Sequence, residues 1–192
     1  MDIIVKSIIN IFTIIDGKIN LLVKNNNDLL EVNCLDNLEL VCNNYIKDNI
    51  GIKDLNLKQC YIFSKKEEKL KLTILYIDII NINDIKLNNK FKFIELNKLD
   101  KSNIIEKSIE YLKKELVLYS VIKKLYQEEF ILPEIQKVYE TLLNKKYDRR
   151  NFRKRLIKLD LIEDLNKFSS NKNGRPAKLY KFKELKEDKI LF

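Results

Sequence analysis

The first part of the chain alternates β-branched and polar residues. This alternation runs from Asp2 to Lys24 and is interrupted at Asp16-Gly17, which predicts a β-hairpin. From Leu38 to Ile50 the apolar residues recur at helical spacing until Gly51, which predicts one amphipathic helix. Three more strand-like runs follow, at 57–63, 70–79 and 90–96. The first hundred residues therefore read as an α+β unit.

Near Asp100 the pattern changes to helical periodicity. The apolar positions between Ile104 and Val121 indicate one long helix, or two helices joined near Glu115. Pro133 occupies a favourable first-turn position of a short helix. The apolar stripe of this helix comprises Ile135, Val138, Tyr139 and Leu142.

A third helix is predicted from its N-cap, Asp148, to about Leu161. Two short strand-like pieces follow it, on either side of a polar turn at Ser169 to Gly174. Helices followed by a β-hairpin make a winged helix. We therefore predict the α+β fold class, with a mixed sheet and helix domain at 1–100 and a winged helix-turn-helix domain at 101–192.

The net positive charge lies in the second half of the chain. Residues 1–100 hold 14 Lys/Arg and 14 Asp/Glu, whereas residues 101–192 hold 23 and 14, so the second half carries the whole net charge of +9. The five arginines also lie there, and the arginine fork can pair with a phosphate or a guanine edge in two hydrogen bonds. They are Arg149, Arg150, Arg153, Arg155 and Arg175. This distribution indicates a polyanionic partner.

The third helix has one apolar face and one basic face. Phe152, Leu156 and Leu159 share the face expected to pack on the core. The early residues of a recognition helix read bases in the major groove, so we expect DNA contacts from the opposite side. The candidates are Arg149, Arg150, Asn151, Arg153, Lys154, Arg155 and Lys158 on the helix, with Lys172 and Arg175 on the hairpin tip.

A solvated basic helix face is the alternative for these charges, and an ordinary flexible turn is the alternative for the polar hairpin tip. The basic segment of the third helix follows a proline-initiated helix, precedes a hairpin and contains the arginine cluster. This combination favours DNA contact. Leu179, Tyr180 and Phe182 are expected to pack the wing rather than to stack on bases.

Several other chemistries are excluded or disfavoured by composition. The chain has no histidine, which excludes serine-histidine catalysis and imidazole-based zinc sites. Cys34, Cys42 and Cys60 form no CxxC pair, so reduced thiols are expected. No apolar run approaches a membrane span. We expect a cytoplasmic protein that holds no cofactor and does not associate with a membrane.

Two separated motifs resemble the winged helix of the NrtR-type, Nudix-related transcriptional regulators. They are Asp148-Arg-Arg-Asn-Phe-Arg-Lys-Arg-Leu156 and Gly174-Arg-Pro-Ala-Lys-Leu-Tyr-Lys-Phe182, and the segment from Phe130 to Leu143 also resembles the family's second helix. The resemblance extends over roughly residues 104 to 183. It implies an N-terminal Nudix-like domain, to which the strands from Asp2 to Lys24 and the run Gln59-Cys-Tyr-Ile-Phe63 are similar.

The Nudix signature itself survives only in fragments. If Gly51-Ile52 ends the signature, Leu30 stands at its first glycine and Asp36 at its early glutamate. Asn44-Tyr45 then replaces its Arg-Glu pair, and Asp48-Asn49 its Glu-Glu pair. Clustered carboxylates are needed to hold Mg²⁺ beside a pyrophosphate. We therefore expect no pyrophosphohydrolase activity, with Asp36 and Asp48 as ordinary exposed acids or weak cation ligands.

The resemblance implies a repressor that binds double-stranded DNA as a homodimer. Its Nudix-like domain would sense ADP-ribose or a related nucleotide and control genes of NAD metabolism, through an effector site that the sequence does not locate. One alternative is a divergent Nudix hydrolase acting on a nucleoside diphosphate derivative. Another is a DNA-binding dimer that responds to no ligand.

Overall fold

The computed structural model describes residues 3–33, 37–52, 55–100, 102–126, 128–169 and 176–191. Its residue contacts form two compact units, with residues 1–13 and 20–111 in unit 1 and residues 14–19 and 112–192 in unit 2. The bounds of these units differ from the predicted domain ranges, 1–100 and 101–192. That residues 1–100 and 101–192 are the two domains stays a prediction. No helix in the described ranges is long and apolar enough to cross a membrane.

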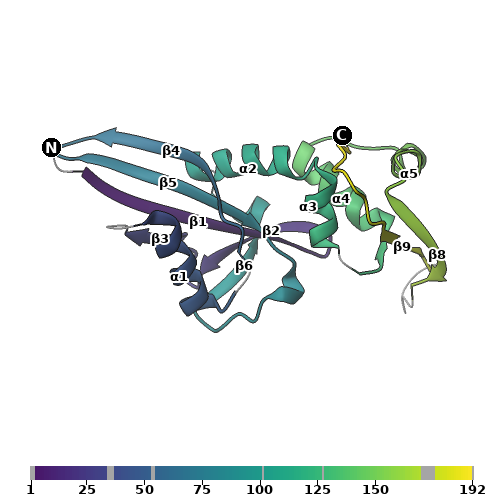
Figure 1. The fold of residues 1–192 in the computed structure, drawn as a ribbon, viewed down its shortest axis with the longest axis horizontal. Coiled ribbons are helices and arrows are strands. Elements are labelled where there is room, and N and C mark those ends of the chain that lie inside the picture. Colours follow the sequence, from purple (N-terminus) through teal and green to yellow (C-terminus); the bar gives the residue numbers. More distant parts are fainter. Residues whose placement is uncertain are drawn as a thin grey trace. The chain divides into compact units, whose positions relative to one another are not determined.

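A six-stranded mixed sheet organises unit 1 (Figure 1). Its order is β4-β5-β1-β2-β6, and β3 pairs with β1 outside this path. The central β1 runs parallel to β5, whereas the pairs β1–β3, β2–β6 and β4–β5 are antiparallel. The strands are β1 (Ile3–Ile15), β2 (Lys18–Lys24), β3 (Leu30–Asn33), β4 (Lys58–Lys66), β5 (Leu70–Ile79) and β6 (Phe91–Glu95).

The predicted strands of this region are confirmed, and one strand was missed. β4 extends three residues beyond its predicted end at residue 63, because pairing continues to Lys66 opposite Leu70. The missed strand is β3, which has only four residues and too short an alternation to detect. Two short 3-10 helices flank β6, at Ile82–Asp84 and Leu96–Lys98.

The predicted hairpin is confirmed as β1 and β2, and its turn needs glycine for two reasons. Gly17 has a φ of 68°, in the left-handed region. A Cβ atom on Gly17 would also lie 3.2 Å from Cδ of Lys137 and 3.3 Å from the carbonyl oxygen of Glu134, all within unit 2. The ammonium of Lys137 donates to the carbonyl of Asp16 at 3.2 Å. The turn therefore packs closely against α4 (Leu132–Leu143).

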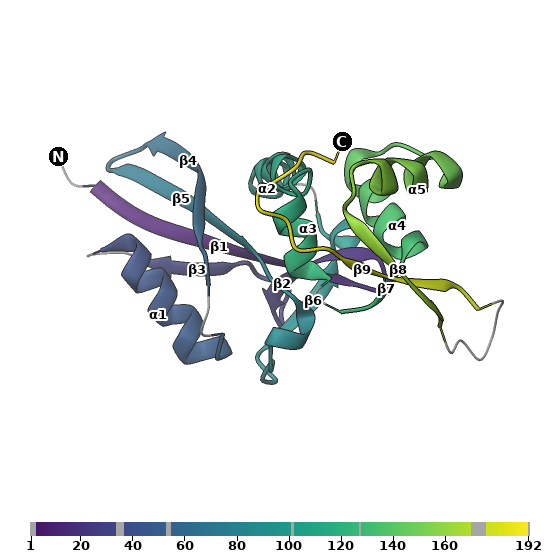
Figure 2. The same cartoon turned by 45° about the vertical axis from the view of Figure 1, so that its right-hand side comes forward.

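The predicted helix of unit 1 is confirmed as α1 (Leu38–Ile50), which lies beside β3 (Figure 2). The side chain of Asn37 caps it by accepting from the backbone N–H of Leu40 at 3.1 Å. Gly51, with a φ of 79°, ends it. Its buried residues join the core of the sheet, and they are Cys42, Ile46 and Ile50.

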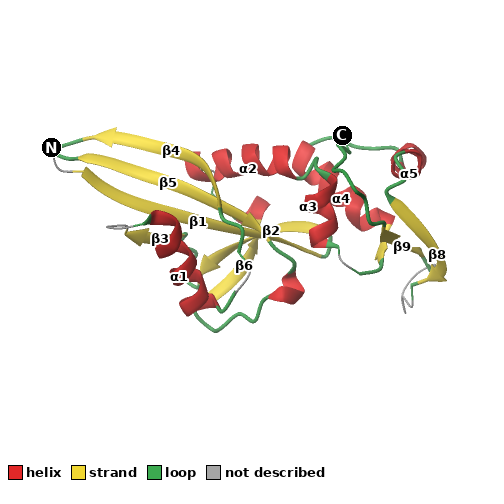
Figure 3. Cartoon of the chain, in the orientation of Figure 1, coloured by secondary structure: helices red, strands yellow, loops and turns green. Residues whose placement is uncertain are grey.

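Unit 2 combines helices with a short three-stranded sheet of order β7-β9-β8 (Figure 3). The helical run after residue 103 is two helices rather than one, as the second alternative predicted. They are α2 (Asn103–Glu115), which belongs to unit 1 up to Tyr111, and α3 (Tyr119–Leu125) in unit 2. The helix with Pro133 in its first turn is confirmed as α4. The remaining elements are β7 (Phe130–Ile131), α5 (Arg149–Lys158), β8 (Ile162–Phe168) and β9 (Lys178–Phe182).

The predicted stripe of α4 is fully in the core of unit 2, with Ile135, Val138 and Tyr139 at 0 % exposure and Leu142 at 4 %. The buried Tyr139 hydroxyl donates to the carbonyl of Leu116 at 2.7 Å, so its polar atom is satisfied. The two-residue strand β7 was not predicted, because its length gives no alternation. It pairs with β9 and completes a winged-helix arrangement.

Candidate nucleic-acid interface

Helix α5 begins where the sequence predicts. The Asp148 carboxylate caps it by accepting from the backbone N–H of Asn151 at 2.9 Å. The helix ends at Lys158, three residues before the predicted end at Leu161. Asp160, with a φ of 57°, lies in the left-handed region that stops a helix. Its carboxylate accepts from Lys183 at 2.6 Å, and this hydrogen bond lowers the pKa of Asp160.

The apolar face of α5 anchors it to unit 2. Phe152 and Leu156 are 2 % and 0 % exposed, which confirms their predicted packing, and Leu159 is half-buried. The Phe152 ring lies 6.2 Å from the ring of Tyr139 and 5.9 Å from that of Tyr147. This packing fixes which side of α5 faces solvent.

The predicted contact residues on α5 are all exposed, and whether they touch DNA stays a prediction. Two of them make contacts within unit 2. The guanidinium of Arg153 lies 5.9 Å from the ring centre of Tyr180 on the wing, within cation–π range. The Nε of Arg155 donates to the carbonyl of Leu191. The exposed set is Arg149, Arg150, Asn151, Arg153, Lys154, Arg155 and Lys158.

Two exposed apolar residues, one on α5 and one on β8, were not among the residues predicted to contact DNA. Ile157 on α5 is 50 % exposed, and Phe168 at the end of β8 is 59 % exposed. Seven residues make nearly two helical turns, so Ile157 shares the face of Arg150. The helical wheel could therefore have found Ile157. An apolar side chain there suits a thymine methyl group.

The wing pairs β8 with β9, and an ion pair links the two strands. Lys178 on β9 donates to Asp164 on β8 at 2.7 Å, and this hydrogen bond is the main cause of the lowered pKa of Asp164. The strand register shifts between Asp164 and Phe168, where Asn166 has a φ of 53°. Of the residues predicted to pack the wing, Tyr180 and Phe182 are buried as expected and Leu179 is half-buried. The predicted tip residues Lys172 and Arg175 lie outside the described residues.

A C-terminal segment, residues 183–191, connects the end of α5 to the start of α3, and the sequence analysis gave it no role. The Lys189 ammonium donates to the carbonyl of Leu159 at 2.8 Å. The backbone N–H of Leu191 donates to the carbonyl of Val117 at 2.8 Å, and Leu191 is fully buried. Ser120 donates its backbone N–H and its hydroxyl to the Asp188 carboxylate, at 2.9 and 2.6 Å. The segment therefore helps to fix the position of α5.

Unit 1 contains a cavity of about 660 Å³ beside α1. Tyr45 and Asn49 reach it from the helix, and burial raises the pKa of Tyr45. The Asn49 side-chain amide donates to the carbonyl of Tyr45 at 2.9 Å, and Asn88 donates to the carbonyl of Asn49 at 2.6 Å. The described lining residues include two lysines and no carboxylate. They are Lys24, Asn25, Asn26, Tyr45, Asn49, Asn89, Lys90 and Phe91.

The side chains at this cavity do not fit a magnesium centre. Mg²⁺ prefers carboxylate oxygens, and the lining offers neutral amides and ammonium groups instead. Within the described ranges, no group of three or more His, Cys, Asp and Glu side chains could hold a metal ion. Asp48 is exposed, and Asp36 lies outside those ranges. Of the cysteines that are described, Cys42 is buried and Cys60 is half-buried, and Cys34 lies outside the described residues.

Comparisons with known proteins agree with this architecture. Residues 123–182 match the family model of the NrtR DNA-binding winged helix domain. The whole chain is similar to Shewanella oneidensis NrtR, solved alone and complexed with a 27mer DNA, with 21 % identity, 93 % of this chain covered and a TM-score of 0.68 in both cases. The match covers 93 % of the NrtR chain in the DNA complex and 94 % of the NrtR chain that was solved alone.

A MutT/nudix family protein from Enterococcus faecalis is similar at 15 % identity, with 95 % of this chain and 87 % of that chain covered and a TM-score of 0.63. The search of curated proteins gave no match. These likenesses show the fold. The chain has an N-terminal unit of the Nudix-like fold and a C-terminal winged helix domain, whose residues 123–182 are similar to the DNA-binding domain of NrtR.

Proposed function

We propose that the protein is a transcriptional repressor that binds double-stranded DNA through the basic face of α5. The observation that carries this proposal is the NrtR-type winged helix match, over a segment in which α5 exposes six arginine and lysine side chains. They are Arg149, Arg150, Arg153, Lys154, Arg155 and Lys158. The exposed Asn151 extends the same surface.

We propose different roles within this surface. Arg150, Asn151 and Lys154 lie toward solvent near the start of α5, where a recognition helix meets base edges. Arg153 is placed beside the wing by its contact with Tyr180, so a phosphate contact suits it. Lys172 and Arg175 complete the proposed surface from the hairpin tip. A homodimer would set two α5 helices about one helical turn of DNA apart on a palindromic operator.

The DNA proposal is tested by Arg150→Ala and Arg153→Ala in equilibrium binding to a selected operator. If Arg150 reads a base, its variant loses about 1 to 3 kcal/mol on the operator and discriminates less at one base position. If Arg153 contacts a phosphate, its variant weakens binding to all sequences and lowers the salt dependence. Lys66→Ala, at an exposed lysine of β4, is the matched control and should change nothing. Unchanged binding in both arginine variants would remove α5 as the recognition helix.

We further propose that unit 1 is a sensor whose effector occupies the cavity beside α1. Lys24 and Lys90 supply two positive charges to a cavity whose described lining holds no carboxylate, so they can bind a pyrophosphate directly rather than through a metal. The Tyr45 ring and the side-chain amides offer a stacking surface and hydrogen bonds for a nucleoside. ADP-ribose or a related nucleotide fits this chemistry, and the resemblance suggests genes of NAD metabolism as the regulon.

The alternatives of a divergent hydrolase and a ligand-independent DNA-binding dimer have different signatures. Calorimetry with ADP-ribose, followed by operator binding with and without it, separates sensor from ligand-independent dimer. The sensor gives heat and a changed operator affinity, whereas the dimer gives neither. Magnesium-dependent turnover of ADP-ribose that is lost in Asp48→Asn would establish the hydrolase. We propose no turnover, because Tyr45 and Asn49 occupy positions where the Nudix signature needs carboxylates.

A further inference from the structure

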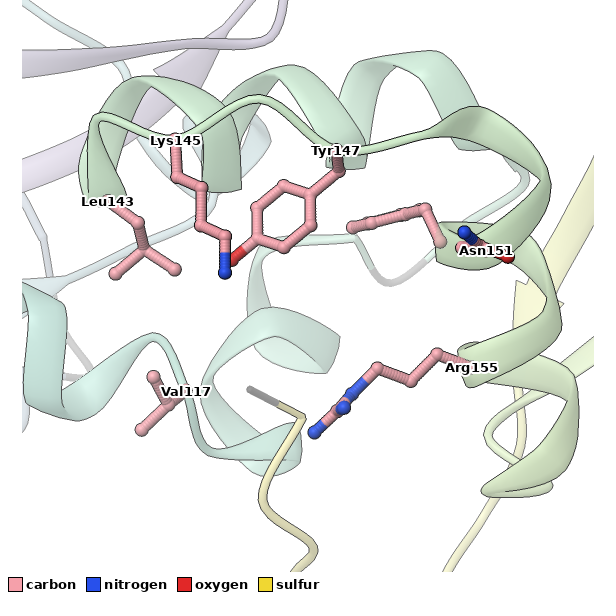
Figure 4. Close-up of a pocket in the computed structure, with 7 residues that line it drawn as sticks. Val117, Leu143, Lys145, Tyr147, Asn151 and Arg155 are labelled. Carbon is pink, nitrogen blue, oxygen red and sulfur yellow. The ribbon is translucent and has the colours of Figure 1, made fainter.

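Unit 2 has a cavity of about 590 Å³ between the loop before α5 and the junction of α2 and α3 (Figure 4). Its volume lies in the range typical of small-molecule sites. This cavity differs from the cavity beside α1, because all of its described lining residues belong to unit 2. The described lining residues are Val117, Leu143, Lys145, Tyr147, Asn151, Phe152 and Arg155.

One part of the wall is apolar and aromatic. Val117 and Leu143 present aliphatic side chains, and Figure 4 shows the Tyr147 ring facing the same space. The Phe152 ring stands 5.9 Å from the Tyr147 ring and is held by the core behind it. A DNA phosphate would leave the half-buried side chains of Val117, Leu143 and Tyr147 uncovered, whereas an apolar or aromatic body would bury them.

The other part of the wall is cationic. Figure 4 shows the Lys145 ammonium and the Arg155 guanidinium both directed into the cavity, from different sides. Lys145 Nζ lies 5.4 Å from the ring centre of Tyr147, and Arg155 is oriented by donating its Nε to the carbonyl of Leu191. None of the described lining residues is acidic, so the two positive charges raise the local potential for an anion.

We propose that this cavity binds a small organic anion, with one carboxylate or phosphate group on an aromatic or aliphatic body. The anionic group sits between Lys145 and Arg155, and the body packs on Tyr147, Val117 and Leu143. The amide of Asn151 offers one further hydrogen bond at the rim. This ligand differs from the proposed nucleotide effector in both site and chemistry.

Binding in this cavity has a consequence for α5. Asn151 and Arg155 line the cavity and also belong to the proposed DNA-contacting set. A ligand that engages them competes with the operator, so its presence weakens DNA binding. This consequence rests on the proposed function, whereas the binding itself does not. The two are distinguished by measuring ligand binding first in the absence of DNA.

The test uses three probes on the full chain, followed by amide chemical shifts in NMR at constant ionic strength. Phenyl phosphate supplies the anion and the body, inorganic phosphate the anion alone, and phenol the body alone. We expect saturable shifts at Asn151 and Phe152 with phenyl phosphate, and at least tenfold weaker binding of the other two. Equal affinity of inorganic phosphate and phenyl phosphate, or no saturable shift with phenyl phosphate, would overturn the proposal.

A matched pair of lysine variants locates the anion. Lys145→Gln removes the charge that points into the cavity, whereas Lys146→Gln removes a neighbouring lysine that is 92 % exposed and pairs with Glu140 at 3.3 Å. We expect about tenfold weaker phenyl phosphate binding in the first variant and an unchanged affinity in the second. Equal losses in both variants would mean nonspecific attraction and would contradict the site. Amide spectra of both variants verify that unit 2 stays folded.

Discussion

Helices α1 and α5 are capped and packed in the same way but differ in the side chains that they expose to solvent. Each begins at a side-chain cap, Asn37 or Asp148, and each buries an apolar face in the core of its unit. The exposed positions of α5 carry arginine and lysine and no acid within the helix, whereas α1 carries Glu39, Lys47 and Asp48. Burial therefore explains why both segments are helices, and only the exposed side chains distinguish the basic helix α5 from α1.

The same contrast extends to the cavities beside the two helices. The described lining of the cavity at α1 includes amides and two lysines, and two of its residues, Tyr45 and Asn49, are predicted to stand where the Nudix signature has glutamates. The cavity at α5 has a lysine and an arginine over an apolar wall. Both favour anions, but the first offers polar partners along its length and the second offers an apolar surface. We therefore propose a different class of anionic ligand for each cavity.

The largest expected effect comes from removing one core residue of each unit. Phe152→Ala should cost about 3 to 5 kcal/mol and Ile46→Ala about 2 to 5 kcal/mol, because each leaves a cavity in a packed core. Hydrogen exchange measured by mass spectrometry should show faster exchange in unit 2 for the first variant and in unit 1 for the second. Faster exchange spread evenly over both units in either variant would contradict the division into two cores.

The next effect concerns effector binding in unit 1. Lys24→Gln and Lys90→Gln should each weaken ADP-ribose binding about tenfold, since each removes a charge-assisted hydrogen bond to phosphate. Calorimetry gives the affinities. Lys47→Gln is the control, because Lys47 is exposed on α1 and does not line the cavity. If Lys47→Gln weakened binding as much as the other two, the cavity would not be the effector site.

A smaller effect is expected at the helix caps. Asp148→Ala and Asn37→Ala should each cost about 1 kcal/mol, because each leaves a backbone N–H of the first helical turn without its side-chain partner. The affinity for DNA should fall in Asp148→Ala alone, since only α5 is proposed to contact DNA. Denaturant unfolding and operator binding measure the two effects. A loss of DNA affinity in Asn37→Ala would show that the comparison of the two helices is wrong.

The smallest expected effect is a pH dependence in unit 2. The backbone N–H of Tyr147 donates to Glu140 at 2.8 Å, which is the main reason why the pKa of Glu140 is lowered from 4.5. A lowered folded-state pKa stabilises the fold above pH 4.5, and this contribution is lost as the pH falls through the folded pKa. Stability measured between pH 3 and 6 should therefore fall more steeply in the natural chain than in Glu140→Gln. Parallel curves would contradict this role of Glu140.

Elements with many periodic residues were predictable from the sequence. The buried stripes of α1, α4 and α5 repeat over several turns, and the caps Asp148 and Gly51 mark ends by their local chemistry. The strands β3 and β7 escaped prediction, because two to four residues carry no period. The end of α5 was set too late, since the left-handed Asp160 is stabilised by Lys183, which lies 23 residues away.

Part of the candidate site could likewise be predicted from the sequence, and part could not. The exposed basic residues of α5 followed from the helical wheel, because exposure is decided by their spacing from Phe152 and Leu156. The contacts of Arg153 with Tyr180 and of Arg155 with Leu191 could not be predicted, since they join segments 27 and 36 residues apart. Both cavities also require segments that meet only in the folded units.

The central claim is that the basic face of α5 recognises a symmetric DNA sequence. Selection of bound fragments from the source genome tests it most directly, with the variant Arg150→Ala taken through the same selection. We predict enrichment of one palindromic motif whose half-sites lie about one helical turn apart, and loss of this motif in the variant. Enrichment of no motif by the natural chain, or of the same motif to the same extent by Arg150→Ala, would contradict the claim.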